Sequence, residues 1–356
     1  MRYIDYSTPL PKLVVFVFVV VHFPHRERHF PAAQGTVNNA LACFSHMNPL
    51  LTTADSIVLR NLLHDASSSD DSSKARSDQI SKDALAALTD DCSDAFETTV
   101  FTGWDRKVLP DWLSDKLLLP YILWAQGVVR RRTDVVFLTH IMLYLLTSVP
   151  SALMLYYRFS YTHAVGHWLM QAYYCGPFTL LLHNHIHNGG VLAKKYAWFD
   201  SIFPYILEPL MGHTWDSYYY HHVKHHHVEG NGPEDLSSTL RYQRDDLFDF
   251  ILYVLRFMTL VWIELPLYFL RKHKRSLAIR CLVSEISTLL AIYLLAIRYP
   301  RPTTFVFILP HIMMRIGMMV GNWGQHAFID EIDPASDFRS SITLIDVAVC
   351  CSVFLT

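Results

Sequence analysis

The chain has 356 residues, of which 51% are hydrophobic and 17% charged, and its formal net charge is −2. This balance provides no basic field for a nucleic acid backbone, so we do not expect nucleic acid as a partner. The six cysteines include no CxxC pair, which argues against a disulfide scaffold or a thiolate metal site. Most of the twenty histidines fall between His163 and His326, and the chemistry is to be sought there.

The first part of the chain, residues 1–103, contains no sequence feature that indicates a function. Residues 13–23 are apolar but shorter than the roughly 20 residues that a membrane-crossing helix needs. We interpret them as a short buried or interfacial segment, with a targeting role as the alternative. The Ser- and Asp-rich residues 66–79 are too polar to bury, and we expect them to be disordered.

Residues 104–356 have the composition of a membrane domain. Arg130, Arg131 and Arg132 are expected to stay in the cytosol, just before a first crossing. We predict four crossings in all, which are residues 135–157, 164–182, 277–297 and 303–320. The predicted fold class is therefore all-α, a multi-pass membrane protein with a cytosolic, histidine-rich cap.

Two further segments are predicted to lie along the membrane surface. Residues 194–220 mix aromatic, charged and proline residues, which suits an interfacial segment. Residues 247–270 are apolar but contain Arg256 and Glu264 and precede the basic run 271–275, all costly to bury or translocate. With both segments in the interface, every histidine cluster faces the same compartment.

Three histidine clusters carry the predicted metal chemistry. In the first, His183 and His187 share a face of an α-helix, whereas His185 points nearly opposite. In the second, the i, i+3, i+4 spacing puts His222, His225 and His226 on one face of an α-helix. His221 and His227 lie off that face and are weaker candidates. The third repeats the i, i+4 spacing at the end of the last crossing. The predicted metal ligands are His183, His187, His222, His225, His226, Asn322 and His326.

Other polar residues receive more modest interpretations. His163, His167, His213 and His311 are expected to make packing or solvent contacts rather than to bind metal. Carboxylates can orient imidazoles through the ring nitrogen that is not bound to metal. The candidates for this role are Asp216, Glu229, Glu234, Asp235 and Asp330.

The order HxxxH, HxxHH and NxxxH, each at a helix end, resembles the membrane fatty acid desaturase family over roughly residues 130–326. The resemblance implies a centre of two iron ions, an acyl lipid substrate, O2, and the membrane of the endoplasmic reticulum. No haem or dinucleotide motif is present, so electrons are expected from a separate donor, a b-type cytochrome or a ferredoxin.

One feature departs from the family pattern. The family carries a last HxxHH box, but no histidine follows His326, and residues 348–356 are apolar and uncharged. We therefore expect a C-terminally truncated chain whose metal centre is incomplete.

Three alternative functions remain open from the sequence. The same centre can hydroxylate a lipid or oxidise a carotenoid ring, since the boxes do not distinguish these reactions from desaturation. A histidine-rich metal transporter is an alternative from another class, although it should place its ligands in the middle of the membrane. An inactive truncated product is the last.

Overall fold

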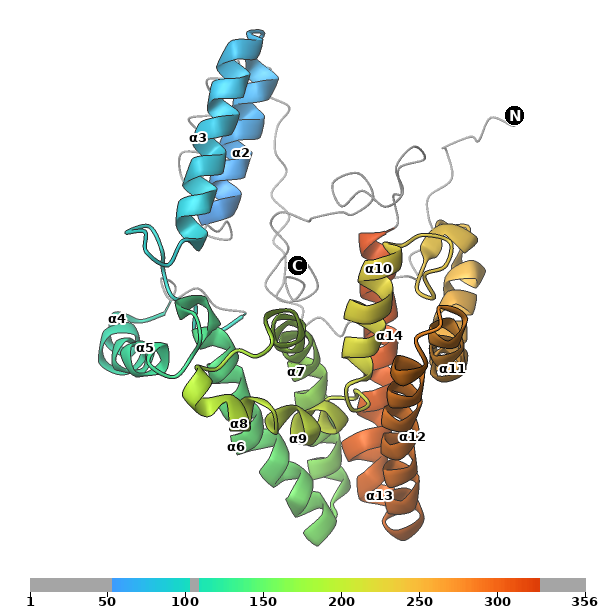
Figure 1. Ribbon diagram of the computed structural model, residues 1–356. Coiled ribbons are helices and arrows are strands. Elements are labelled where there is room, and N and C mark those ends of the chain that lie inside the picture. Colours follow the sequence, from blue (N-terminus) through green and yellow to red (C-terminus); the bar gives the residue numbers. More distant parts are fainter. Residues whose placement is uncertain (1–52, 103–108, 327–356) are drawn as a thin grey trace, which may run out of the picture. The chain divides into compact units, whose positions relative to one another are not determined.

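The computed structural model describes residues 53–102 and 109–326 of the chain (Figure 1). All of these residues belong to one unit, within residues 49–356, and the description below concerns them. The described residues are mostly helical, and they include an isolated β-bridge between Val129 and Leu192. The all-α prediction is confirmed. The apolar residues 13–23 and the C-terminal residues 327–356, where truncation is expected, lie outside the described residues.

Two polar helices precede the membrane domain. These are α2 (Thr53–Ser67) and α3 (Asp71–Thr89). The Asp70 side chain caps α3 by accepting a hydrogen bond from the Ser72 N–H at 3.1 Å. Asn61 of α2 donates to Asp78 of α3 at 2.6 Å. Residues 66–79 are thus largely helical rather than disordered, because the cap and these interhelical hydrogen bonds satisfy polar groups that composition alone leaves unpartnered. The domain boundary at residue 103 remains a prediction.

Four helices are long and apolar enough to cross a membrane within the described part of the chain. They comprise α6 (Val135–Tyr157) with the preceding η3 (Arg132–Asp134), α11 (Leu247–Arg271), α12 (Arg275–Arg298), and the run of α13 (Pro300–Thr303), η7 (Thr304–Ile308) and α14 (Leu309–Gln325). The number of these candidate spans equals the predicted number of crossings. Their identity differs, because α11 meets the criterion and the helix containing residues 164–182 does not.

That helix, α7 (Tyr161–Asn188), lies beside α6 and contains polar residues that lower its apolarity. The Ser148 hydroxyl of α6 donates to Gln171 Oε1 of α7 at 2.9 Å, and Ser151 contacts His167 Nδ1 at the same distance. Buried polar groups of one helix are thereby satisfied by the other. A membrane crossing by α7 stays a prediction, and its 28 residues are long enough for it.

Short helices join these long ones. Before α6 lie α4 (Asp111–Leu113), η2 (Ser114–Leu118) and α5 (Leu119–Gln126). After α7 come η4 (Lys194–Tyr196), α8 (Ala197–Asp200), α9 (Phe203–Leu210), η5 (Tyr219–His226), α10 (His227–Glu229) and η6 (Thr239–Arg241). The first box ends α7, the second forms η5, and the third ends α14. In Figure 1 the yellow segment that carries the second box lies beside the red end of α14.

Candidate metal centre

The first box occupies the last turn of a regular α-helix. His183 and His187 are one turn apart on α7, and their ring centroids are 4.6 Å apart. His185 points elsewhere, with its Nε2 3.0 Å from the backbone carbonyl of Asp200. The helix ends because Gly189 takes the left-handed conformation, with a φ of 63°. The predicted pairing of His183 with His187 therefore holds in the structure.

The second box lies in a π-helix, whose repeat differs from that of an α-helix. A π-helix forms i→i+5 hydrogen bonds, so residues five apart come together. His221 stacks on His226 at 5°, and the Nε2 atoms of His222 and His227 are 3.0 Å apart. The predicted grouping of His222, His225 and His226 assumed the α-helical repeat. The structure separates His225 from the other two.

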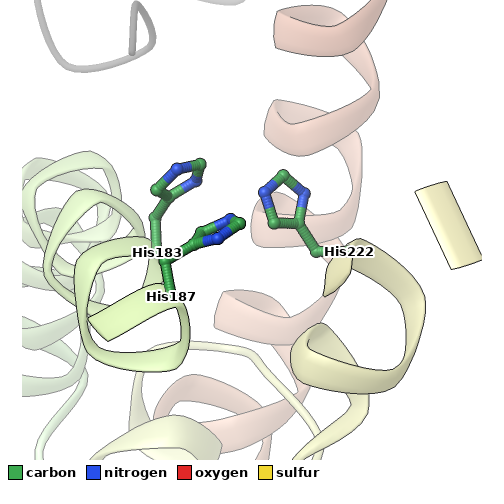
Figure 2. A group of neighbouring side chains, drawn as sticks. All are labelled: His183, His187 and His222. Carbon is green, nitrogen blue, oxygen red and sulfur yellow. The ribbon is translucent and has the colours of Figure 1, made fainter. Parts of the chain in front are cut away.

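One residue of the second box closes a three-histidine group with the first. The ring of His222 lies 4.7 Å from that of His183 and 5.3 Å from that of His187. One ligand nitrogen from each of these three residues can be chosen so that all lie within 4.8 Å of one another. Figure 2 shows the two rings from α7 facing the ring of His222 across a gap. Three imidazoles at this separation fit a transition metal ion.

His227 belongs to this group more closely than the sequence suggested. Its ring lies 4.8 Å from that of His187 and 4.4 Å from that of His222. With an α-helical repeat, His227 lies off the face that carries the predicted ligands. The π-helical repeat of the preceding residues places its ring beside those of His187 and His222. A sequence signal existed in the i, i+5 spacing to His222.

The third box completes the wall of a shared cavity. This cavity has a volume of about 100 Å³, and its wall includes His183, His222, His226 and Asn322. The Asn322 amide donates to the Ser237 carbonyl at 2.8 Å and to the Tyr253 hydroxyl at 2.7 Å. The ring of His326 lies 5.8 Å from that of His226. The three boxes, far apart in sequence, therefore meet around one space.

A buried carboxylate orients the second box from behind. Asp235 is fully buried, and its Oδ2 lies 2.6 Å from Nδ1 of His226. Burial alone would raise the pKa of Asp235, but hydrogen bonds with His225 and His226 hold the pKa below its usual range. A carboxylate on Nδ1 leaves Nε2 of His226 for a metal ion. Of the predicted orienting carboxylates, Asp235 is the one that contacts these imidazoles.

The remaining carboxylates have other partners. Asp216 accepts from the Tyr205 hydroxyl at 2.9 Å. Glu229 and Glu234 both pair with Lys272. Asp330 lies outside the described residues.

His225 lies in different surroundings from the histidines of the cavity wall. Its ring is fully buried against Tyr268 at 4.3 Å, and its Nε2 accepts the Leu236 N–H at 2.9 Å. His221, His225 and Asp235 also offer ligand atoms within 4.8 Å of one another. Because Asp235 already accepts from Asn231, Ser237 and His226, its oxygens are committed to the protein.

Two histidines of the cavity wall, His221 and His222, are held in the neutral form that binds metal. Burial, together with the imidazoles of His183, His226 and His227, lowers the pKa of His222 well below its ordinary value. Burial likewise lowers the pKa of His221 to about 3. Neutral imidazole is the metal-binding form, so the site is electrostatically suited to a cation.

The comparisons with known proteins agree with this geometry. The chain matches no curated protein and no solved structure. The family model described as fatty acid desaturase matches residues 167–350, about half of the chain, and these residues include all three boxes. The chain therefore belongs to the fatty acid desaturase family.

Proposed function

We propose that the chain is an O2-dependent desaturase of lipid acyl chains, and that its histidines hold two iron ions. The observation that carries this proposal is the cavity of about 100 Å³ to which all three boxes contribute. A structural zinc ion takes four ligands in a closed site. Donors converging from three separate boxes around an open cavity are better suited to a centre that activates a small molecule.

The ligands divide between two groups in this proposal. His183, His187 and His222 hold one ion, with His227 beside them. His226, Asn322 and His326 contribute to the other. His225 is also a predicted ligand from its helical spacing, but the proposal leaves it out of both groups, because its Nε2 accepts a backbone N–H.

The bound iron would supply the oxidising power to remove hydrogen from an unactivated C–H bond with O2 and two electrons. The chain's own residues hold and orient the site. Asp235 fixes the ring of His226, and Tyr218 stacks on His222 with centroids 4.9 Å apart. Leu180, Met318 and Met319 form the less polar wall of the cavity, which suits an acyl chain and disfavours water.

We further propose that the boxes face the cytosol at the endoplasmic reticulum and that α11 lies along this face. Two contacts support the placement of α11. The Tyr253 hydroxyl, in its first half, donates to the Ser237 carbonyl at 3.2 Å, and Lys272, just past its end, pairs with Glu229 at 3.1 Å. Glu229 and Ser237 lie 3 and 11 residues after His226, so the first half of α11 and the residue just past its end both contact the segment that follows the second box. Electrons would arrive at this face from a separate b-type cytochrome or ferredoxin.

Metal analysis and lipid analysis test this function together, on a version of the chain to which the last HxxHH box of the family pattern is added. For this version we expect about two iron ions per chain after purification in detergent, and acyl products lighter by two hydrogens in membranes that contain it. The unextended chain, for which the sequence predicts an incomplete centre, should hold less iron and give less product. Products that gain one oxygen atom would assign the same centre to hydroxylation. One tightly held zinc ion with no iron would refute the proposal.

Single cysteines test the topology. Exposed positions Lys195 and Lys274, replaced one at a time by cysteine, should react with an impermeant thiol reagent applied from the cytosolic side. Cysteine at exposed Arg301 should be protected under the same conditions. Labelling of the Lys274 position only from the lumenal side would mean that α11 crosses the bilayer.

A further inference from the structure

A buried ion pair joins two of the long helices, α12 and α14. Glu285 of α12 accepts from the guanidinium of Arg315 on α14, and the two residues are 3% and 9% exposed. Neither belongs to the wall of the histidine cavity. Taking two charges out of water is costly, and an apolar pair of similar volume is often as stable or more so. Stability alone therefore does not account for this pair.

The ion pair is fixed to the loop that leads into the second box. The Thr214 hydroxyl, on a residue that is 1% exposed, donates to Glu285. The Thr214 carbonyl accepts the Ser217 N–H at 3.1 Å, which starts the helical turn ahead of η5. Because hydrogen-bonded turns connect Thr214 to η5, a shift at Thr214 also moves His222, eight residues further along the chain.

Both long helices also hold the backbone of this loop. The Trp215 N–H donates to the Thr288 hydroxyl of α12 at 3.1 Å. The Gly212 carbonyl accepts from Nδ1 of His311 on α14 at 2.9 Å. Gly212 has a φ of 88°, and a Cβ atom at this position would lie 2.3 Å from the Pro310 carbonyl oxygen. The loop therefore lies against α14 with no room for a side chain between them.

The helix that holds this loop also carries the third box. Asn322 follows Arg315 by seven residues, about two α-helical turns, which is roughly 10 Å along α14. A slip of α14 along α12 would move the third box relative to the second. Apolar side chains could repack after such a slip, but the slip would also separate Glu285 from Arg315 and leave two unpaired charges buried. The ion pair therefore opposes the movement that would disturb the centre.

We propose that Glu285 and Arg315 are positioning residues, which hold the second box in register with the third through Thr214 and the loop that follows it. Neither residue touches the metal site itself. The inference rests on the proposed function, since it takes both boxes to supply ligands to one metal centre.

Titration of the full chain in detergent with Co(II), a spectroscopic stand-in for Fe(II), tests this role. The visible absorption of bound Co(II) reports the number and geometry of its ligands, and the unfolding temperature is measured on the same samples. The double variant Glu285→Leu/Arg315→Met removes both charges and keeps an apolar filling. We expect its unfolding temperature to stay the same or rise, while its Co(II) affinity falls about tenfold and the absorption spectrum changes.

A second ion pair of the chain provides the matched control. Arg256 and Glu264 pair at 2.9 Å within α11, and neither belongs to the wall of the histidine cavity. The double variant Arg256→Met/Glu264→Leu should therefore leave the Co(II) affinity and spectrum as in the unmodified chain.

Variants of Thr214 test the link between the ion pair and the loop while the pair stays intact. Thr214→Val removes the hydroxyl that donates to Glu285, so it should weaken Co(II) binding and change the spectrum in the same direction as the double variant. Thr214→Ser keeps the hydroxyl and should behave as the unmodified chain does.

The outcomes separate this inference from the proposed function. If the unmodified chain binds Co(II) and Glu285→Leu/Arg315→Met binds it with the same affinity and spectrum, the positioning role is refuted and the proposed function stands. If that variant does not fold, Thr214→Val decides, and an unchanged spectrum refutes the role. Equal changes in the control Arg256→Met/Glu264→Leu refute it as well. If the unmodified chain binds no Co(II), the proposed metal centre fails together with the inference.

Discussion

The first and second histidine boxes read alike in the sequence but fold differently. In α7 the histidines follow the α-helical repeat, and His183 and His187 meet as their spacing predicts. In η5 the π-helical repeat pairs His221 with His226 and His222 with His227. A helical wheel is therefore a sound guide to the first box and a misleading one to the second, because one residue more per hydrogen-bonded turn rotates every later side chain.

The difference between the boxes has an identifiable cause. The first box ends a long helix whose other face packs against α6, and its repeat is set by that helix. The second box is short and is held from outside, by the Leu236 N–H on His225 and by Asp235 on His226. The first contact holds the ring of His225 outside the cavity wall, whereas the second fixes the ring of His226 within that wall. π-helical turns of this kind are common at functional sites.

The largest expected effect comes from breaking the first box. His183→Ala and His187→Ala should each lower iron content and reduce lipid oxidation by at least about 100-fold, since each removes a group proposed to bind iron directly. His185→Ala is the control within the same turn, because His185 faces the Asp200 carbonyl. Metal analysis and mass spectrometry of lipids give both quantities. Equal losses from all three variants would mean that the box acts only by holding the helix end.

A second pair of variants tests the repeat of the second box. His222→Ala should lower the iron content per folded chain about tenfold or more. His225→Ala should lower the unfolding temperature but keep at least half of the iron per folded chain. The reason is that His225 packs against Tyr268 and lies outside the cavity wall. Iron loss from His225→Ala as large as that from His222→Ala would show that the segment takes the α-helical repeat when metal is bound.

A smaller effect is expected behind the second box. Asp235→Asn should weaken iron binding by about tenfold, because an amide is a poorer acceptor for the Nδ1 proton of His226 and no longer fixes its tautomer. Asp235→Glu should recover part of the affinity. Titration with Fe(II) under anaerobic conditions measures the change. Unaltered affinity in Asp235→Asn would restrict the carboxylate to a role in folding.

An effect on folding stability, rather than on iron binding, is expected at the turn that starts the π-helix. Glu208 accepts the Asp216 N–H at 2.9 Å, and Asp216 takes a φ of 53°. Burial raises the pKa of Glu208 to about 8. The folded state therefore holds this proton more tightly than the unfolded state, and stability should fall as pH rises from about 4.5, the usual pKa of a glutamic acid, towards 8.

Glu208→Gln removes this titration and keeps an acceptor for Asp216. We expect the variant to be more stable than the unmodified chain at pH 8, by roughly 2 kcal/mol, with the difference shrinking towards pH 5. Thermal unfolding in detergent across this range measures it. A difference that does not change with pH would show that Glu208 does not titrate in this window.

The sequence by itself determined the helical membrane class, the positions of the three boxes and the pairing within the first. It could do so because membrane length and α-helical spacing are local properties of the chain. The family pattern, which needed only the order of the boxes, was visible for the same reason.

Tertiary structure alone decided the rest. Residues 66–79 are largely helical because α2 and α3 satisfy each other's polar groups, as in the hydrogen bond from Asn61 to Asp78. The π-helical repeat, which brings His227 to the site and turns His225 from it, depends on Leu236, Asp235 and Tyr268. None of these contacts is encoded in the spacing of the histidines. Register in a short helix is set by whatever holds it from outside, and only the folded chain shows what that is.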